Sequence, residues 1–345
     1  MQVMRAEIRE QPDAVARALE NAAPHARQLA QLLRDRATRH VVIAARGTSD
    51  NAATYARYLL EIALRVPVGL AAPSVYTLYK AEVDLRDALV LGISQSGVAP
   101  DVIEVLAAAR AQGAVTACIT NDEQSPIASQ GHIVLPCSAG PEKAVAATKT
   151  YTTSLALIAL LAAEWKQDDS LRHDLLAIPT HIEATLGLEA EMDALAAELA
   201  DLRECVVLAR GINLATAQEV ALKLTETNYL AARPFSAADF RHGPIAAAGK
   251  ELPCFLFAAP GAAYSDVLDL ACELERRGSP VVLFTSGSPV AALGRRLVRL
   301  PGSVVELLSP LLTVVPGQLL AASLATVKGN DADSPRGLHK VTRTR

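Results

Sequence analysis

The sequence has few aromatic residues and no surplus of positive charge. Aromatics make up 4% of its 345 residues, and 33 basic residues face 37 acidic ones, for a net charge of −4. Nucleic-acid-binding proteins usually carry a basic patch, so this balance argues against a nucleic-acid partner. Hydrophobic residues reach 51% and consist mostly of Ala, Leu and Val, which excludes a disordered chain and predicts an aliphatic core.

Cysteine is sparse, and no Cys-x-x-Cys pair occurs. The five cysteines are odd in number and widely spaced: Cys118, Cys137, Cys205, Cys254 and Cys272. This pattern predicts small buried side chains in a reducing compartment rather than a disulfide framework. No secretion signal follows the start, and the apolar run at about 155–163 is too short to span a bilayer. We therefore expect a cytoplasmic chain with no membrane partner.

Short apolar runs alternate with longer helical stretches. Strands are predicted at 40–45, 88–93 and 115–120, with helices between them at 51–63 and 101–112. The strands are continuously apolar, which predicts that both of their faces are buried. Strand–helix–strand order with such strands indicates an α/β fold of parallel sheets flanked by helices.

The second half of the sequence repeats the first at an offset of about 165 residues. Ala-Arg-Gly recurs, each time between a predicted strand and a predicted helix. Asp101 matches Asp266, and Gly113 matches Gly278. Two copies of one α/β domain account for this pattern.

The repeat also sets the expected domain boundaries. The two copies are placed at residues 36–170 and 200–327, with a helical connector at 171–199 between them. An N-terminal helical segment at 1–35 precedes the first copy. A tail without apolar periodicity, at 328–345, follows the second.

Hydroxyl side chains are concentrated in the first copy. Its loop Ser-Gln-Ser-Gly at 94–97 aligns with Ala-Pro-Gly-Ala at 259–262 in the second copy. Open parallel sheets bind ligands at the carboxyl ends of their strands, and helix N-termini there suit a phosphate. Such hydroxyls are also common as plain helix caps. Neither of the two glycine-rich nucleotide motifs occurs, so the sequence predicts a phosphorylated ligand other than a nucleotide.

Five segments carry a more specific signal. In order, they are ARGTSDNA, SQSG, AGPEKAVAATKTYTTSLALIALLA, EVALKLTETNYLAARPFSAADFRHGPIA and KGNDADSPRGLHKVTRTR. Together they resemble the paired sugar-isomerase (SIS) domains of glucosamine-6-phosphate synthases and of SIS-type glucosamine-6-phosphate deaminases. The resemblance implies two tandem SIS domains, each a doubly wound, flavodoxin-like parallel sheet flanked by helices. It also implies a phosphosugar substrate and chemistry without a cofactor or metal.

The resemblance assigns substrate contacts to three loops of the first copy. The residues are Thr48, Ser49, Ser94, Gln95, Ser96 and Thr148, with backbone help near Val145. Two positions depart from the family pattern, because Ala99 and Ala147 stand where relatives carry hydroxyls. Fewer hydroxyls imply weaker phosphate binding or a changed pose of the sugar.

A charged stripe marks the helix predicted at 215–229. Glu219, Lys223 and Glu226 share one face of it, which alone would indicate a solvent-exposed ladder of ion pairs. The resemblance instead makes Glu226 the carboxylate that moves a proton between C1 and C2, and Lys223 its orienting neighbour. The role of Glu219 stays open. Such acid–base work typically contributes about 10²–10⁴-fold to the rate.

Two further catalytic residues follow from the resemblance. His242, held by the Gly-Pro turn after it, opens the sugar ring and comes from the neighbouring subunit, which implies a homodimer. We expect apolar helix faces such as 151–163 to line the dimer interface. Lys340 forms a Schiff base with an open-chain ketose phosphate, and the tail folds over the occupied site. An ordinary lysine is only about 0.04% free amine at pH 7, so this role calls for surroundings that disfavour the charged form.

The expected reaction converts glucosamine 6-phosphate into fructose 6-phosphate and ammonia. The synthase obtains nitrogen from glutamine through a separate domain with a cysteine nucleophile. This chain starts at its SIS pair and has Cys118 as its first cysteine, so glutaminase chemistry is not expected. Three alternatives stay open: an aldose–ketose phosphate isomerase without nitrogen chemistry, a deaminase of another hexosamine phosphate such as galactosamine 6-phosphate, and a phosphosugar-sensing module.

Overall fold

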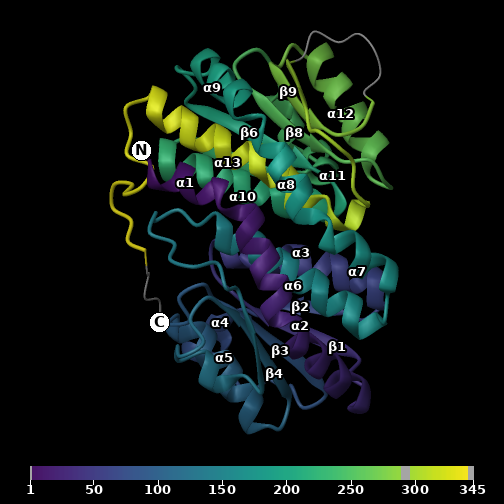
Figure 1. The fold of residues 1–345 in the computed structure, drawn as a ribbon. Coiled ribbons are helices and arrows are strands. Elements are labelled where there is room, and N and C mark those ends of the chain that lie inside the picture. Colours follow the sequence, from purple (N-terminus) through teal and green to yellow (C-terminus); the bar gives the residue numbers. More distant parts are fainter. Residues whose placement is uncertain (1, 289–295, 341–345) are drawn as a thin grey trace. The chain divides into compact units, whose positions relative to one another are not determined.

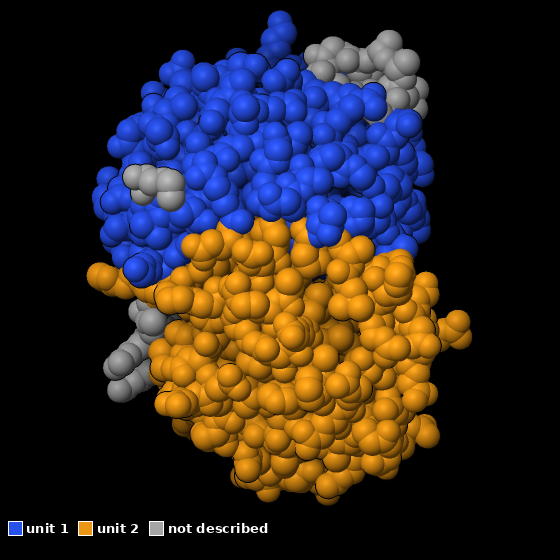
Figure 2. Space-filling model, viewed as in Figure 1, with its two compact units in different colours: residues 1–9, 143–146, 180–338 blue, residues 10–142, 147–179, 339–345 orange. Residues whose placement is uncertain are grey.

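The chain forms two compact units, each built around its own parallel sheet (Figure 2). The computed structural model describes residues 2–288 and 296–340. Unit 1 consists of residues 1–9, 143–146 and 180–338, and unit 2 of residues 10–142, 147–179 and 339–345. The predicted fold class, an α/β chain with two parallel sheets flanked by helices, is confirmed.

The sheet of unit 2 has five parallel strands in the order β2-β1-β3-β4-β5 (Figure 1). The strands are β1 (His40–Ala44), β2 (Val68–Leu70), β3 (Ala88–Ile93), β4 (Val115–Thr120) and β5 (Ile133–Pro136). Every residue of β3 and β4 is buried, as their continuous apolar character predicts. The chain order reverses between β1 and β3, and such a switch point creates a ligand crevice at the carboxyl ends of the strands.

Helix α6 is the buried core helix of unit 2. The helices of this unit are α2 (Gln11–Asp35), α3 (Thr48–Leu64), α4 (Pro73–Thr77), α5 (Pro100–Ala111), α6 (Lys149–Lys166) and α7 (Asp169–Leu176). Residues 149–165 of α6 are all buried, and the helix packs against α2 and α3. The expectation that residues 151–163 line a subunit interface is therefore wrong, because their side chains are already covered within the same unit.

The sheet of unit 1 follows the same path, with strand order β10-β9-β8-β6-β7. The strands are β6 (Glu204–Ala209), β7 (Ala231–Ser236), β8 (Cys254–Ala258), β9 (Val281–Thr285) and β10 (Arg296–Arg299). The helices are α1 (Val3–Arg9), α8 (Ile178–Leu186), α9 (Glu189–Glu198), α10 (Leu214–Asn228), α11 (Ala237–Arg241), α12 (Tyr264–Arg276) and α13 (Pro310–Val327). Read from the β7 edge, the order matches that of unit 2, so the sequence repeat corresponds to a repeated fold.

A matching ion pair marks the repeat in both units. Arg46 Nε lies 2.7 Å from Asp101 Oδ2, and Arg210 Nε lies 3.4 Å from Asp266 Oδ2. Each pair ties the loop after the first strand of the copy to the start of the helix after its third strand. The recurring arginine and aspartate of the sequence thus share a structural role.

The two copies differ at the start of that helix. In unit 1 the N–H groups of Ala262 and Ala263 donate to the carboxylate of Glu306, at 2.7 and 3.3 Å. A Cβ on Gly261 would lie 2.2 Å from Glu306 Oε2, so only glycine lets the carboxylate approach this closely. An acidic side chain of the chain itself therefore caps the N-terminus of α12.

One helix among residues 2–288 and 296–340 is long and apolar enough to cross a membrane. It covers residues 306–327. Its most apolar 18-residue stretch has a mean hydropathy of 1.6, and 94% of that stretch is buried inside the protein. Helix α13 packs against α9 and α10 of the same unit. Burial of this kind is typical of a core helix, and this stretch is longer than the apolar run at 155–163 that stands out in the sequence.

All five cysteines are free thiols, and four of them are buried. Burial raises the pKa of Cys137 to about 11 and that of Cys118 to about 12. Such thiols stay protonated at neutral pH and act as small apolar side chains, as predicted.

Candidate functional site

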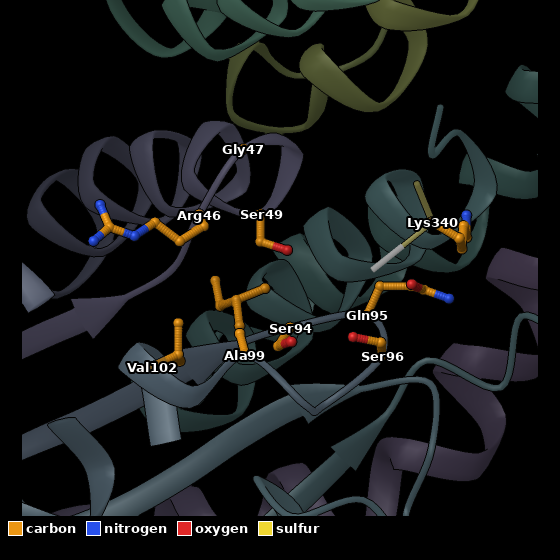
Figure 3. Close-up of a pocket in the computed structure, with 10 residues that line it drawn as sticks. Arg46, Gly47, Ser49, Ser94, Gln95, Ser96, Ala99, Val102 and Lys340 are labelled. Atoms are coloured by element: carbon orange, nitrogen blue, oxygen red, sulfur yellow. The ribbon is translucent and has the colours of Figure 1, made fainter. Parts of the chain in front are cut away.

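A pocket of about 340 Å³ opens at the carboxyl edge of the sheet of unit 2 (Figure 3). Two strand–helix loops, the start of α5 and the C-terminal tail line it, through Arg46, Gly47, Ser49, Ile93, Ser94, Gln95, Ser96, Ala99, Val102 and Lys340. The pocket therefore brings together five residues predicted from the sequence: Ser49, Ser94, Gln95, Ser96 and Lys340.

The loop between β1 and α3 supplies one wall of the pocket. Gly47 has a φ of 56°, a left-handed conformation that favours glycine, and α3 begins at the next residue. Ser49 lies in the first turn of α3 with its hydroxyl directed into the pocket (Figure 3). Thr48 is half-buried beside it and is not among the residues that line the pocket.

The loop between β3 and α5 supplies the floor. Ser94 is buried, and its Oγ accepts a hydrogen bond from Gly97 N at 3.1 Å. Gly97 has a φ of 65°, and a Cβ there would lie 2.0 Å from Ser125 Oγ, so the loop requires glycine at this position. Gln95 and Ser96 are half-buried. Ala99, one of the two departures from the family pattern, also lines the pocket.

Arg46 is a lining residue that the sequence analysis missed. Its Nε pairs with Asp101, whose side chain is 1% exposed and whose Oδ1 also accepts a hydrogen bond from Val102 N at 2.9 Å. In Figure 3 the guanidinium points away from Ser49 and Lys340. Arg46 therefore braces the loop against α5. The recurrence of Ala-Arg-Gly in both copies was the signal that could have identified it.

Lys340 reaches the pocket from the C-terminal tail and pairs with Glu142. Its Nζ lies 2.9 Å from Glu142 Oε2. The other oxygen of Glu142 accepts hydrogen bonds from the N–H groups of Thr148 and Thr150, at 2.9 and 3.1 Å. The hydroxyl of Thr150 donates to Oε2 at 2.7 Å. Glu142 was also missed from the sequence, although it lies within the segment AGPEKAV.

The surroundings of Glu142 keep it ionised. Burial by itself would raise its pKa, but the charge of Lys340 and the hydrogen bonds from Lys340, Thr148 and Thr150 outweigh burial and hold the pKa below its usual range. The Lys340 amine therefore faces a buried carboxylate at 2.9 Å, and not the apolar or cationic surroundings that we expected for a nucleophilic lysine.

Two other predicted binding residues lie outside the pocket lining. Thr148 is the N-cap of α6 and is buried. Val145 belongs to unit 1, where its N–H donates to the carbonyl oxygen of Asp333 at 3.0 Å. The backbone N–H expected to contact the substrate near Val145 thus has a partner within the chain.

The charged stripe on α10 is mostly buried. Lys223 Nζ lies 2.7 Å from Glu226 Oε2 and 3.4 Å from Glu219 Oε1. The side chains of Glu219 and Lys223 are 0% and 1% exposed, whereas that of Glu226 is 23% exposed. The solvent-exposed ladder is therefore wrong. A buried lysine instead holds one partly accessible carboxylate in place.

His242 is exposed at the C-terminal end of α11. Its N–H donates to the carbonyl oxygen of Asp239 at 3.1 Å. The neighbouring Arg241 donates from Nη1 to Asp266 Oδ1 at 2.5 Å and from Nη2 to its carbonyl oxygen at 3.2 Å, which ties the turn to α12. Glu226, Lys223 and His242 all belong to unit 1. Within the described residues, no three His, Cys, Asp or Glu side chains are grouped as for a metal ion.

Comparison with known proteins shows which family the chain belongs to. The profile of the SIS domain matches residues 36–164 and 198–328. A glutamine–fructose-6-phosphate aminotransferase (isomerizing) from Zymomonas mobilis is 34% identical over 315 residues, covering 88% of this chain and 51% of that protein. The chain thus spans about half the length of this relative.

Solved structures also resemble nearly the whole chain. A candidate phosphosugar isomerase from Silicibacter pomeroyi DSS-3 is 34% identical, with a TM-score of 0.87 over 96% of this chain and 100% of that one. The C-terminal domain of glucosamine-fructose-6-phosphate aminotransferase from Francisella tularensis is 28% identical, with a TM-score of 0.88 over 97% and 98% of the two chains.

Proposed function

The chain belongs to the SIS domain family, and on that premise we propose that it is a phosphosugar isomerase. The finer proposal is that it deaminates glucosamine 6-phosphate to fructose 6-phosphate and ammonia. The observation that carries the proposal is the hydroxyl-lined pocket of unit 2, with an amine at its wall. The names of the related proteins, which refer to fructose 6-phosphate and to a phosphosugar, support the same substrate class.

The phosphate group of the sugar is proposed to bind between the two loops. Ser49, Ser94 and Ser96 supply hydroxyl donors. The start of α3 adds backbone N–H groups and a partial positive charge. This combination suits a dianion on a short flexible molecule.

Replacing Ser96 with alanine is expected to weaken phosphosugar binding by about 10- to 100-fold, because a hydrogen bond to a charged group contributes about 1.5–3 kcal/mol. The dissociation constant for fructose 6-phosphate, measured by calorimetry, checks this. Ser129→Ala is the matched control, since the Ser129 hydroxyl donates to Pro126 O in an exposed turn. Equal affinities in wild type and S96A would remove Ser96 from the phosphate site.

The proposed chemistry is proton transfer on the open-chain sugar. His242 assists opening of the ring to the C1 aldehyde. Glu226 removes the proton from C2 and returns it to C1, and the C2 ammonium gives up one proton to O1, which leaves a hydroxyl on C1 and an iminium at C2. The iminium is then hydrolysed by water directly, or the Lys340 amine adds at C2, displaces ammonia and forms an imine that water hydrolyses. By either route, one glucosamine 6-phosphate and one water give one fructose 6-phosphate and one ammonia. Lys223 keeps the Glu226 carboxylate oriented, as the 2.7 Å contact between them supports.

We also propose that His242 acts in a second copy of the chain, within a homodimer. Its exposed position at the end of α11 supports this arrangement. Sedimentation would then show a dimer. Mixing His242→Ala with Glu226→Gln subunits would restore part of the activity, and an active monomer would refute the proposal.

The test of function is a single assay that follows ammonia and fructose 6-phosphate together, with glucosamine 6-phosphate as the substrate. Equal formation of both products supports deamination. Interconversion of glucose 6-phosphate and fructose 6-phosphate without ammonia would replace deamination by plain isomerisation. No turnover of either substrate would contradict both readings and leave another hexosamine phosphate or a sensing role.

One observation favours the second candidate, an aldose–ketose phosphate isomerase without nitrogen chemistry. Lys340 Nζ is paired with a carboxylate, at 2.9 Å from Glu142 Oε2. In a plain isomerase, the Lys340 ammonium would serve as a charge for the phosphate and would not need to react. Glu226 and His242 would keep the same roles.

A further inference from the structure

Glu142 is a buried carboxylate that faces the amine of Lys340 in unit 2. Its side chain is 0% exposed, and that of Lys340 is 24% exposed. Two backbone N–H groups at the start of α6 and the hydroxyl of Thr150 bind its two oxygens. The carboxylate is therefore fixed, and one oxygen is directed at Lys340 Nζ.

We infer that Glu142 is a positioning residue that holds the Lys340 amine at the pocket wall for attack on the carbonyl carbon of an open-chain ketose phosphate. The inference rests on the proposed function and deepens it. A lysine side chain has a flexible four-carbon stem. A fixed anion gives its end one position next to Gln95 and Ser96 (Figure 3).

The charge of Glu142 is compatible with Schiff-base chemistry. A lysine ammonium and a ketone give a protonated imine and one water, so a cation faces the carboxylate before and after the step. The N–C bond forms after Nζ releases one proton, and that proton is returned to the carbinolamine oxygen as it leaves as water. Oε2 of Glu142, 2.9 Å from Nζ, lies within hydrogen-bond reach of the proton in between.

Glu142→Gln tests the inference because it keeps the size of the side chain and removes its charge. The remaining carbonyl oxygen can still accept from Thr148 N and Thr150 N. The amide group then presents N–H to Lys340, so the ion pair that fixes the Lys340 amine is lost. With fructose 6-phosphate and borohydride, the yield of trapped adduct is expected to fall about 10- to 100-fold, as for loss of a charged hydrogen bond.

A double-variant cycle separates positioning from a general structural effect. Glu142→Gln combined with Lys340→Met should be no more impaired in turnover than Lys340→Met alone, because Glu142 acts through Lys340. Glu10→Gln is the matched control: Glu10 pairs at 2.5 Å with Lys149 at the start of the same helix, and its loss should leave the adduct yield unchanged. Additive losses in the double variant would overturn the inference.

A second readout does not depend on the sugar. The rate at which acetic anhydride labels Lys340, followed by mass spectrometry, should rise about tenfold in Glu142→Gln because a charge-assisted hydrogen bond is lost. Thr150→Val, which loosens Oε2 and keeps the charge, should show a smaller rise and covers the case in which Glu142→Gln does not fold. Unchanged labelling in both variants, or no trapped adduct in wild type, would refute the inference. Absence of ammonia release in wild type with the adduct still trapped would refute only the deaminase function.

Discussion

Glu226→Gln is expected to lower turnover by about 10²–10⁴-fold while leaving phosphosugar binding intact. Glutamine keeps the shape of the side chain but cannot take a proton from C2. Lys223 retains Glu219 as a partner at 3.4 Å, so the helix should keep its packing. Binding should survive because the phosphate pocket is formed by residues of unit 2.

The measurement for Glu226→Gln is twofold. Steady-state kinetics gives the loss in kcat, and nuclear magnetic resonance in heavy water follows solvent deuterium appearing at C1 of the product. The exchange should disappear with the turnover, since both depend on the same carboxylate. Glu251→Gln, at an exposed position of unit 1, is the control. Normal exchange in Glu226→Gln would assign the proton transfer to another residue.

Lys340→Met is expected to abolish the borohydride-trapped adduct and to reduce ammonia release on the order of 10²-fold, since an activated nucleophile supports a covalent route. Methionine keeps much of the apolar stem and removes the amine. In wild type, the adduct yield should rise with pH, because attack requires an unprotonated amine. Intact-mass spectrometry of the reduced protein measures the adduct directly.

The result with Lys340→Met also decides between the two proposed activities. If ammonia release stops while glucose 6-phosphate and fructose 6-phosphate still interconvert, Lys340 serves nitrogen chemistry alone. Full deaminase activity in the variant would show that the imine is hydrolysed without Lys340. Lys143→Met, an exposed lysine close by in the sequence, is the control for loss of a positive charge.

The elements with continuous apolar runs were predictable from the sequence. The strands expected at 88–93 and 115–120 coincide with β3 and β4, because burial on both faces leaves an unbroken pattern. Strand β7 was missed, since it contains Pro234, lies at a sheet edge and has only one buried residue among its six. Strand β2 has only three residues, which is too short for any periodic signal.

The residues of the candidate site also fall into a predictable group and an unpredictable one. The serines of the pocket lie just after buried strands of one parallel sheet, so they could be expected to meet at the same edge of that sheet. Glu142 could not be found in this way, because its partner Lys340 lies 198 residues further along the chain. Burial of Lys223 was equally hidden, since helical spacing places charges on one face without showing whether that face meets solvent or protein.

The carboxylate of Glu306 makes the two copies of the fold differ in how their stability depends on a bound anion. Unit 1 carries the anion at the start of α12 as part of its own covalent structure, so no solute concentration changes that term. Under the proposed function, unit 2 receives its anion from solution. A ligand at a hundred times its dissociation constant then raises the free energy of unfolding by about 2.7 kcal/mol. The phosphosugar concentration would thus set the stability of unit 2 against unfolding, whereas unit 1 carries its stabilising charge permanently.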